Sequence, residues 1–245
     1  DRKQLHSNSI SDFLEFINHA DYVCGHNILN HDLIHIERVA SFDFAEVKTI
    51  DTLFLSPLLF PIKPYHALLK DDKLQTDELN NPLNDAVKAK DLFFDEVSAF
   101  NELDSDLKQI YSSLLEDKKE FSSFFSYINC PAFKGDIKEL IQKRFSGEIC
   151  QYIQLDKLTM ENAIELAYCL ALINSNSRYS ITPPWVIKNY SDVVRVMYLL
   201  RNNPCITGCP YCNQSLDATI GLKKYFGFNS YRTFDGKALQ EDAVK

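Results

Sequence analysis

The chain has 245 residues, of which 45% are hydrophobic and 24% are charged, a composition typical of a folded globular protein. Its formal net charge of -8 argues against a uniformly basic nucleic-acid-binding surface, but it leaves open a local basic groove or binding through metal ions. No apolar run reaches the length of a membrane span and no signal peptide is recognisable, so we expect no membrane partner. Seven cysteines, an odd number with three close together, indicate a reducing compartment, and we expect a cytoplasmic location.

The first 40 residues predict a helix, a strand and a second helix. Ser9 and Ser11 precede an apolar group that indicates a capped amphipathic helix ending near His19. The apolar run 20–24 ends at Gly25 and predicts a strand. The helix that follows carries Asp32 in its first turns, and its apolar residues are spaced by four, three and four: Leu29, Leu33, Ile36 and Ala40. Strand ends in open α/β sheets are common ligand sites.

A second strand-to-helix unit follows at residues 47–58. Residues 47–50 predict a short strand, and Asp51 is expected to cap a helix that Pro61 and Pro64 stop. We expect a further helical turn at residues 65–69, a loop at 71–80, and a helix with Pro82 in its first position. The predicted inward face of that helix consists of Leu83, Ala86, Val87, Phe94 and Val97.

Two of these stretches resemble motifs of the DEDD 3′–5′ exonucleases. The order Gly25-x-Asn27-Ile-x-Asn-x-Asp32-Leu resembles the second exonuclease motif, and the segment from Asn80 to Asp85 resembles the third. The resemblance implies a ribonuclease-H-like α/β fold in which Asp32 and Asp85 hold Mg²⁺ or Mn²⁺. It also places Asn27 and Asn80 at catalytic positions.

The chain departs from that family in two respects. Asn80 and Asn81 stand where the family has a His or a Tyr, and neither can act as a general base, so catalysis would need another base, for instance a metal-bound hydroxide. No Asp-x-Glu strand precedes Asp32, so we expect a fragment that lacks the first strands and is inactive alone. The pair His31 and His35 is expected to be a surface or packing pair rather than a metal site.

Residues 98–200 predict a block of helices that carries no recognisable chemistry. Amphipathic or apolar patterns indicate helices near residues 103–114, 121–128, 137–145, 160–173 and 193–200, with an extended segment at 180–186. Cys169 is expected to be a core residue.

Cys205, Cys209 and Cys212 have Cys-x3-Cys-x2-Cys spacing, with Gly208 and Pro210 to turn the backbone. This pattern predicts a metal knuckle, with Zn²⁺ as the expected ion. The fourth ligand stays open: Cys150, a histidine, Asp217 or a residue outside the chain. Radical-SAM enzymes share the spacing, but only 33 residues follow Cys212, too few for their barrel. An iron–sulfur cluster on another fold stays an alternative.

Residues 222–244 resemble the entry to RecQ-type helicases. The matching positions are Phe228, Arg232 and Gln240, although Gln240 stands further from the Arg than in that family. The resemblance implies ATP binding in a longer parent protein, since no phosphate-binding loop occurs in this chain.

We therefore expect four segments: an exonuclease-like domain (1–97), a helical connector (98–200), a cysteine knuckle (201–219) and the beginning of a helicase domain (220–245). The parent would process single-stranded DNA or 3′ ends with ATP. The alternatives are a catalytically dead module that binds DNA or protein, an iron–sulfur protein, and a purely structural connector.

Overall fold

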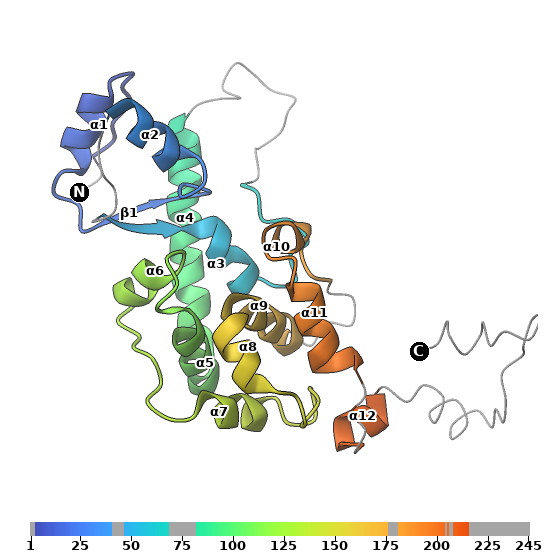
Figure 1. Cartoon of the computed structure of the whole chain (residues 1–245). Helices are drawn as coiled ribbons and strands as arrows, with labels where there is room; N and C mark the ends of the chain where they lie inside the picture. The colour runs from blue at the N-terminus through green and yellow to red at the C-terminus, as the bar shows by residue number, and fades with distance from the viewer. Residues whose placement is uncertain are drawn as a thin grey trace, which may run out of the picture.

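The computed structural model describes residues 3–40, 47–68, 82–175, 181–203, 205 and 208–215. Helices predominate in this part of the chain, and Figure 1 shows their arrangement. The elements are α1 (Ile10–Ile17), β1 (Tyr22–Gly25), α2 (Asp32–Ala40), β2 (Lys48–Asp51), α3 (Thr52–Leu59), α4 (Pro82–Glu102), α5 (Ser105–Leu115), α6 (Ser122–Tyr127), α7 (Ile137–Arg144), α8 (Leu155–Glu161), α9 (Ala163–Asn174), α10 (Pro184–Asn189), α11 (Val193–Met197), the π-helix η1 (Tyr198–Asn202) and α12 (Pro210–Ser215).

The two strands of the described residues pair in parallel, with Gly25 opposite Asp51. Each strand leads directly into a polar turn or helix, so both carboxyl ends lie at one edge of the pair. The predicted helix starts nearby are confirmed: Ser9 caps α1 by accepting from the Asp12 N–H, and Asp51 caps α3 by accepting from the Leu53 N–H. A small apolar cluster of Val23, Ile28 and Leu33 fixes α1 and α2 over β1.

The main core surrounds α9, which contacts α3, α5, α8 and α11 (Figure 1). Because α9 is apolar on nearly all sides, it suits a helix buried among others. Cys169 is 1% exposed and donates its thiol hydrogen to the Val193 carbonyl, which confirms its core role. The Tyr168 hydroxyl donates to the Phe54 carbonyl over 2.9 Å and joins α9 to α3.

The predicted inward face of α4 is confirmed at Val97, which packs against the main core, but it is wrong at Phe94. Phe94 is 54% exposed, whereas the buried positions are Ala89, Phe93, Glu96 and Phe100. Phe93 and Phe94 point about 100° apart on a helix, so only one of them can face the core. Because Glu96 interrupts the apolar pattern, the sequence does not reveal that Ala89, Phe93, Glu96 and Phe100 form the buried face of the helix.

Three other local predictions need correction. The expected helix at residues 160–173 is two helices with a break at Asn162, and Met160 is 82% exposed. Asn162 turns its amide to Asp192 and Arg195 rather than continuing the helix. Pro184 begins α10 inside the segment predicted as extended, since proline fits a first helical turn. Residues 65–68 form no helical turn.

No backbone break separates residues 1–97 from 98–200, because α4 runs through this boundary. One apolar cluster also joins Ile50 and Phe54 to Leu200. The division into an exonuclease-like domain and a connector stays a prediction about function, as does the ribonuclease-H-like fold. Among the described residues, no helix combines the length and apolar character needed to cross a membrane.

Candidate metal centre and the strand-end loop

Four cysteines meet at the end of the described chain. Their sulfur atoms, from Cys150, Cys205, Cys209 and Cys212, all lie within 4.8 Å of one another, and the group could hold a metal ion. Of the candidates for the fourth ligand, the structure brings Cys150, in the loop after α7, to the other three cysteines. Three of the four residues are buried, and Cys205 is partly buried.

The knuckle itself depends on a tight turn before α12. Gly208 has a φ of +70° and donates its N–H to the Cys205 carbonyl over 3.1 Å. A Cβ at this position would lie 2.7 Å from Asn213 Oδ1, so glycine suits both the dihedral angle and the space. Pro210 then opens α12, which carries Cys212.

Backbone N–H groups point at the sulfurs within the cluster. Cys209 N–H donates to Cys205 Sγ over 3.1 Å, and Cys212 N–H and Gln151 N–H donate to Cys209 Sγ over 3.4 and 3.5 Å. Burial alone would raise the pKa of Cys209, but these N–H donors lower it to about 7. Burial raises the pKa of Cys212 to about 12. A bound cation would stabilise all four sulfurs as thiolates.

Cys150 is brought to the knuckle by contacts with η1. Its N–H donates to the Leu200 carbonyl over 2.9 Å, and the Arg201 guanidinium donates to the Glu148 carbonyl over 2.9 Å. The Tyr211 hydroxyl of α12 donates to the Arg201 carbonyl over 3.0 Å. The loop 146–151, η1 and α12 thus form one connected support for the four sulfurs.

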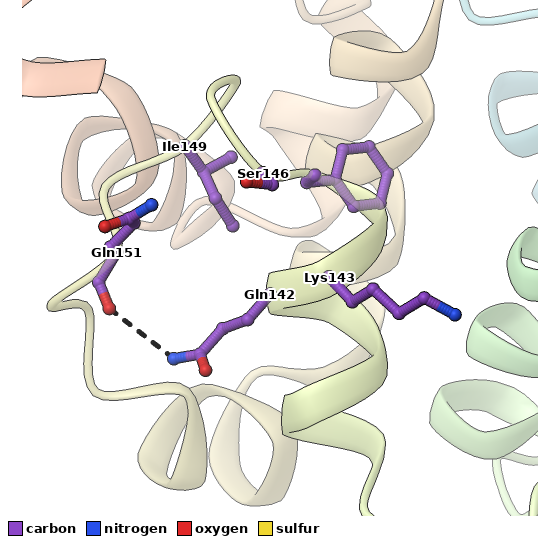
Figure 2. A pocket seen from close by; sticks show the side chains of 6 residues that line it. Gln142, Lys143, Ser146, Ile149 and Gln151 are labelled. Carbon is purple, nitrogen blue, oxygen red and sulfur yellow. Dashed lines mark hydrogen bonds between the residues drawn. The ribbon is translucent and has the colours of Figure 1, made fainter. Parts of the chain in front are cut away.

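A hollow of about 400 Å³ opens beside this support (Figure 2). Buried Phe145 and Ile149 contribute its apolar surface, while Gln142 Nε2 donates to the Gln151 carbonyl over 3.5 Å. Its remaining lining residues are Lys143 and Ser146. The hollow therefore packs against the loop that carries Cys150.

Asp32 and Asp85 occupy the helix starts where the sequence predicts them. Asp32 is the first residue of α2, is 56% exposed and lies 3.5 Å from His31 Nδ1. Asp85 lies exposed in the first turn of α4. Carboxylates are also favourable at helix N-termini without any metal. Among the described residues, the cysteine quartet is the one group of three or more candidate ligands, and neither aspartate belongs to it.

The loop between β1 and α2 is anchored by buried Asp51. Its carboxylate accepts from the N–H groups of Asn27 at 2.7 Å, Leu29 at 3.1 Å and Leu53 at 3.0 Å. Asn27 has a φ of 62°, a left-handed conformation that asparagine tolerates better than most residues. His26 Nδ1 shares a hydrogen with Thr52 Oγ1 at 2.9 Å. Asp51 therefore fixes the predicted strand-end motif in place.

Sequence reasoning missed Glu96, His26 and His66 as polar residues of this region. Glu96 is fully buried, and His66 is 5% exposed. Burial raises the pKa of Glu96 well above its usual range, and the nearby charge of Asp51 raises it further. Glu96 could have been found from the sequence, because it is a glutamate within the apolar stripe of α4. No residue spacing in the sequence marks the two histidines as site residues.

The remaining predicted site residues lie outside the described residues: Asn80, Asn81, Asp217, Phe228, Arg232 and Gln240. His31 and His35 are exposed neighbours with ring centroids 5.0 Å apart. Comparisons of the chain with protein-family models, curated proteins and solved structures found no match.

Proposed function

We propose that Cys150, Cys205, Cys209 and Cys212 bind one Zn²⁺ ion that holds the end of the described chain onto the helical core. Four sulfurs arranged tetrahedrally at about 2.3 Å from one zinc lie about 3.8 Å apart. The observed limit of 4.8 Å between all four sulfurs supports such a site. An iron–sulfur cluster spreads its thiolates around several atoms and needs wider spacing.

The four-sulfur set further supports a structural role. A catalytic zinc keeps one position open for water or substrate, whereas four cysteine ligands close the coordination sphere. The zinc would supply positive charge to four thiolates. The backbone N–H groups of Cys209 and Cys212, which donate to the sulfurs of Cys205 and Cys209, would orient those two sulfurs.

Metal content of purified variants tests this proposal. We expect one zinc per chain in the wild type, a colourless preparation, and strongly reduced zinc after Cys150→Ser. The matched control is Cys130→Ser, since Cys130 lies outside the cluster. Full zinc content in Cys150→Ser, or a brown iron-containing preparation, would contradict the proposal.

As a second candidate, we propose that the strand-end region is an exonuclease-like unit that binds DNA 3′ ends through Mg²⁺ or Mn²⁺. The observation that favours it is the Asp51-anchored loop, which leaves the Asp32 carboxylate exposed beside the ends of β1 and β2. In this proposal the parent protein also has a RecQ-like helicase that uses ATP, which rests on the resemblance of residues 222–244 alone.

Paramagnetic broadening by Mn²⁺ tests the second candidate. We expect Mn²⁺ to broaden signals near Asp32 and Asp85, and expect Asp32→Asn or Asp85→Asn to weaken this effect. The control is Asp91→Asn, on the same helix as Asp85. Its exposed ion pair with Lys90 contributes little to stability, so the variant should stay folded and keep the wild-type broadening by Mn²⁺. Unchanged Mn²⁺ binding in both variants would contradict the proposed site, and DNA binding without degradation would favour the catalytically dead module.

A further inference from the structure

A second hollow, of about 300 Å³, lies where the β1–α2 loop meets the segment after α3 and the start of α10. It is separate from the cysteine cluster, and its volume is at the lower end of the range for small-ligand sites. Its lining residues are His26, Asn27, Leu53, Pro64, Tyr65, His66, Ala67 and Trp185.

Two aromatic side chains form walls suited to a flat ring. Trp185 is held edge-to-face against Phe54 with ring centroids 5.0 Å apart, and it also contacts Tyr190 at 6.2 Å. Tyr65 is 78% exposed, so its ring is accessible to a ligand. A fixed indole and an accessible phenol ring are the kind of surfaces on which planar bases stack.

Polar groups with unused hydrogen-bonding capacity line the same hollow. His66 Nδ1 is 2.8 Å from Ser56 Oγ, whereas its buried Nε2 has no partner among the described residues. Burial and the nearby Lys63 lower the pKa of His66 to about 4, so its ring is neutral at physiological pH. The Asn27 side-chain amide, with one donor and one acceptor side, also makes no hydrogen bond within the described chain.

We propose that this hollow binds a nucleobase, stacked against Trp185 or Tyr65 and hydrogen-bonded on its edge by the Asn27 amide. A base edge offers adjacent donors and acceptors, which match the donor and acceptor of an asparagine amide. A metal ion is disfavoured because the hollow offers two histidines and no third charged or sulfur ligand.

The base could belong to a free nucleotide or to a single strand. This inference deepens the second candidate function, since a base held here would lie beside the loop that leads to Asp32, but binding itself needs neither Mg²⁺ nor catalysis.

Tryptophan fluorescence measures the binding directly, because Trp185 is the single tryptophan of the chain. The full 245-residue chain is titrated without added Mg²⁺ or Mn²⁺, using deoxyadenosine monophosphate, an eight-residue oligo(dA) and ribose 5-phosphate as probes. We expect saturable quenching by at least one of the two base-containing probes and none by ribose 5-phosphate. Quenching by the mononucleotide identifies a free nucleotide as a sufficient ligand, and quenching by the oligonucleotide alone identifies a strand.

Three variants separate recognition from folding. Tyr65→Ala removes an exposed ring and should weaken binding by about fivefold or more. Asn27→Gly keeps the left-handed backbone accessible while removing the amide and should also weaken binding. Tyr198→Ala, which removes a half-exposed tyrosine of η1, should leave binding unchanged.

The inference would be overturned if neither base-containing probe gave a saturable response, or if ribose 5-phosphate quenched the fluorescence equally. It would also be overturned if Tyr65→Ala and Asn27→Gly both bound as tightly as the wild type. Base binding without DNA degradation would contradict the proposed nuclease activity and leave the base-binding inference intact. DNA degradation without a change in Trp185 fluorescence would contradict the base-binding inference and leave the proposed nuclease activity intact.

Discussion

Glu96 is a buried acidic residue whose placement has an electrostatic cost. It is fully buried, and neither carboxyl oxygen has a hydrogen-bond partner among the described residues. Burial raises its pKa well above the usual range, Asp51 and Asp95 raise it further, and Lys63 opposes them. Burial and these neighbouring charges together favour the neutral acid over the carboxylate in the folded protein.

This placement predicts a pH dependence of stability. An unfolded glutamate has a pKa of about 4.3, so above that pH the unfolded chain releases a proton that the folded chain retains. The free energy of unfolding should then fall by up to about 1.4 kcal/mol per pH unit as the pH rises toward the folded pKa. Urea unfolding at pH 5 and pH 8 should show a smaller fall for Glu96→Gln than for the wild type.

The control for this prediction is Glu102→Gln, on the exposed end of the same helix. It should keep the wild-type fall in stability between the two pH values. An identical pH dependence for Glu96→Gln and the wild type would mean that Glu96 is ionised in the folded state.

Asp51 gives a second prediction for a single residue. Asp51→Asn replaces one oxygen acceptor with an NH₂ group and leaves at least one of three N–H groups unpaired. We expect a loss of about 1–3 kcal/mol in the free energy of unfolding by urea. Asp21→Asn, at an exposed position before β1, should change stability little. Equal stability of the two variants would show that the loop does not depend on the carboxylate.

Among the elements, α9 should carry the largest share of packing energy. Leu170 is fully buried in it, and Leu170→Ala should lower the free energy of unfolding by about 2–5 kcal/mol through lost contacts and a cavity. Met160→Ala, in α8 with 82% of its side chain exposed, is the matched control and should cost far less. Similar losses in the two variants would contradict the packing described here.

Local signals predicted the elements better than the contacts between them. Ser9 and Asp51 marked two helix starts because capping depends on neighbouring backbone N–H groups. The inward face of α4 was partly mispredicted because a buried glutamate is assigned to the surface by pattern alone. The break at Asn162 depends on Asp192 and Arg195, which lie far along the chain and leave no local signal.

The metal site also shows that local sequence signals do not reveal contacts between distant residues. The three clustered cysteines indicated a knuckle through their spacing, whereas the choice of Cys150 depends on the contacts of its loop with Leu200 and Arg201. Tertiary packing of residues far apart in sequence decides such a ligand. The hollow beside His66 was likewise absent from the sequence reading, because its walls come from three separate segments.

At the scale of the whole molecule, the proposed zinc joins the loop after α7 to α12. Removing zinc with a strong chelator should therefore release residues 148–151 and 208–215 while the core around α5 and α9 stays folded. Hydrogen exchange measured by mass spectrometry should become about tenfold faster or more in those segments, with little change in α5 and α9. Uniformly faster exchange would mean that zinc supports the entire fold, and no change anywhere would argue against a bound structural ion.

X-ray absorption at the zinc edge of the purified chain tests the four-sulfur site most directly. The account predicts four sulfur neighbours at about 2.3 Å, the distance of zinc–thiolate bonds. Zinc that is retained by Cys150→Ser should have three sulfur ligands and one nitrogen or oxygen ligand. A wild-type spectrum with nitrogen or oxygen neighbours in place of any sulfur, or one that Cys150→Ser leaves unchanged, would contradict it.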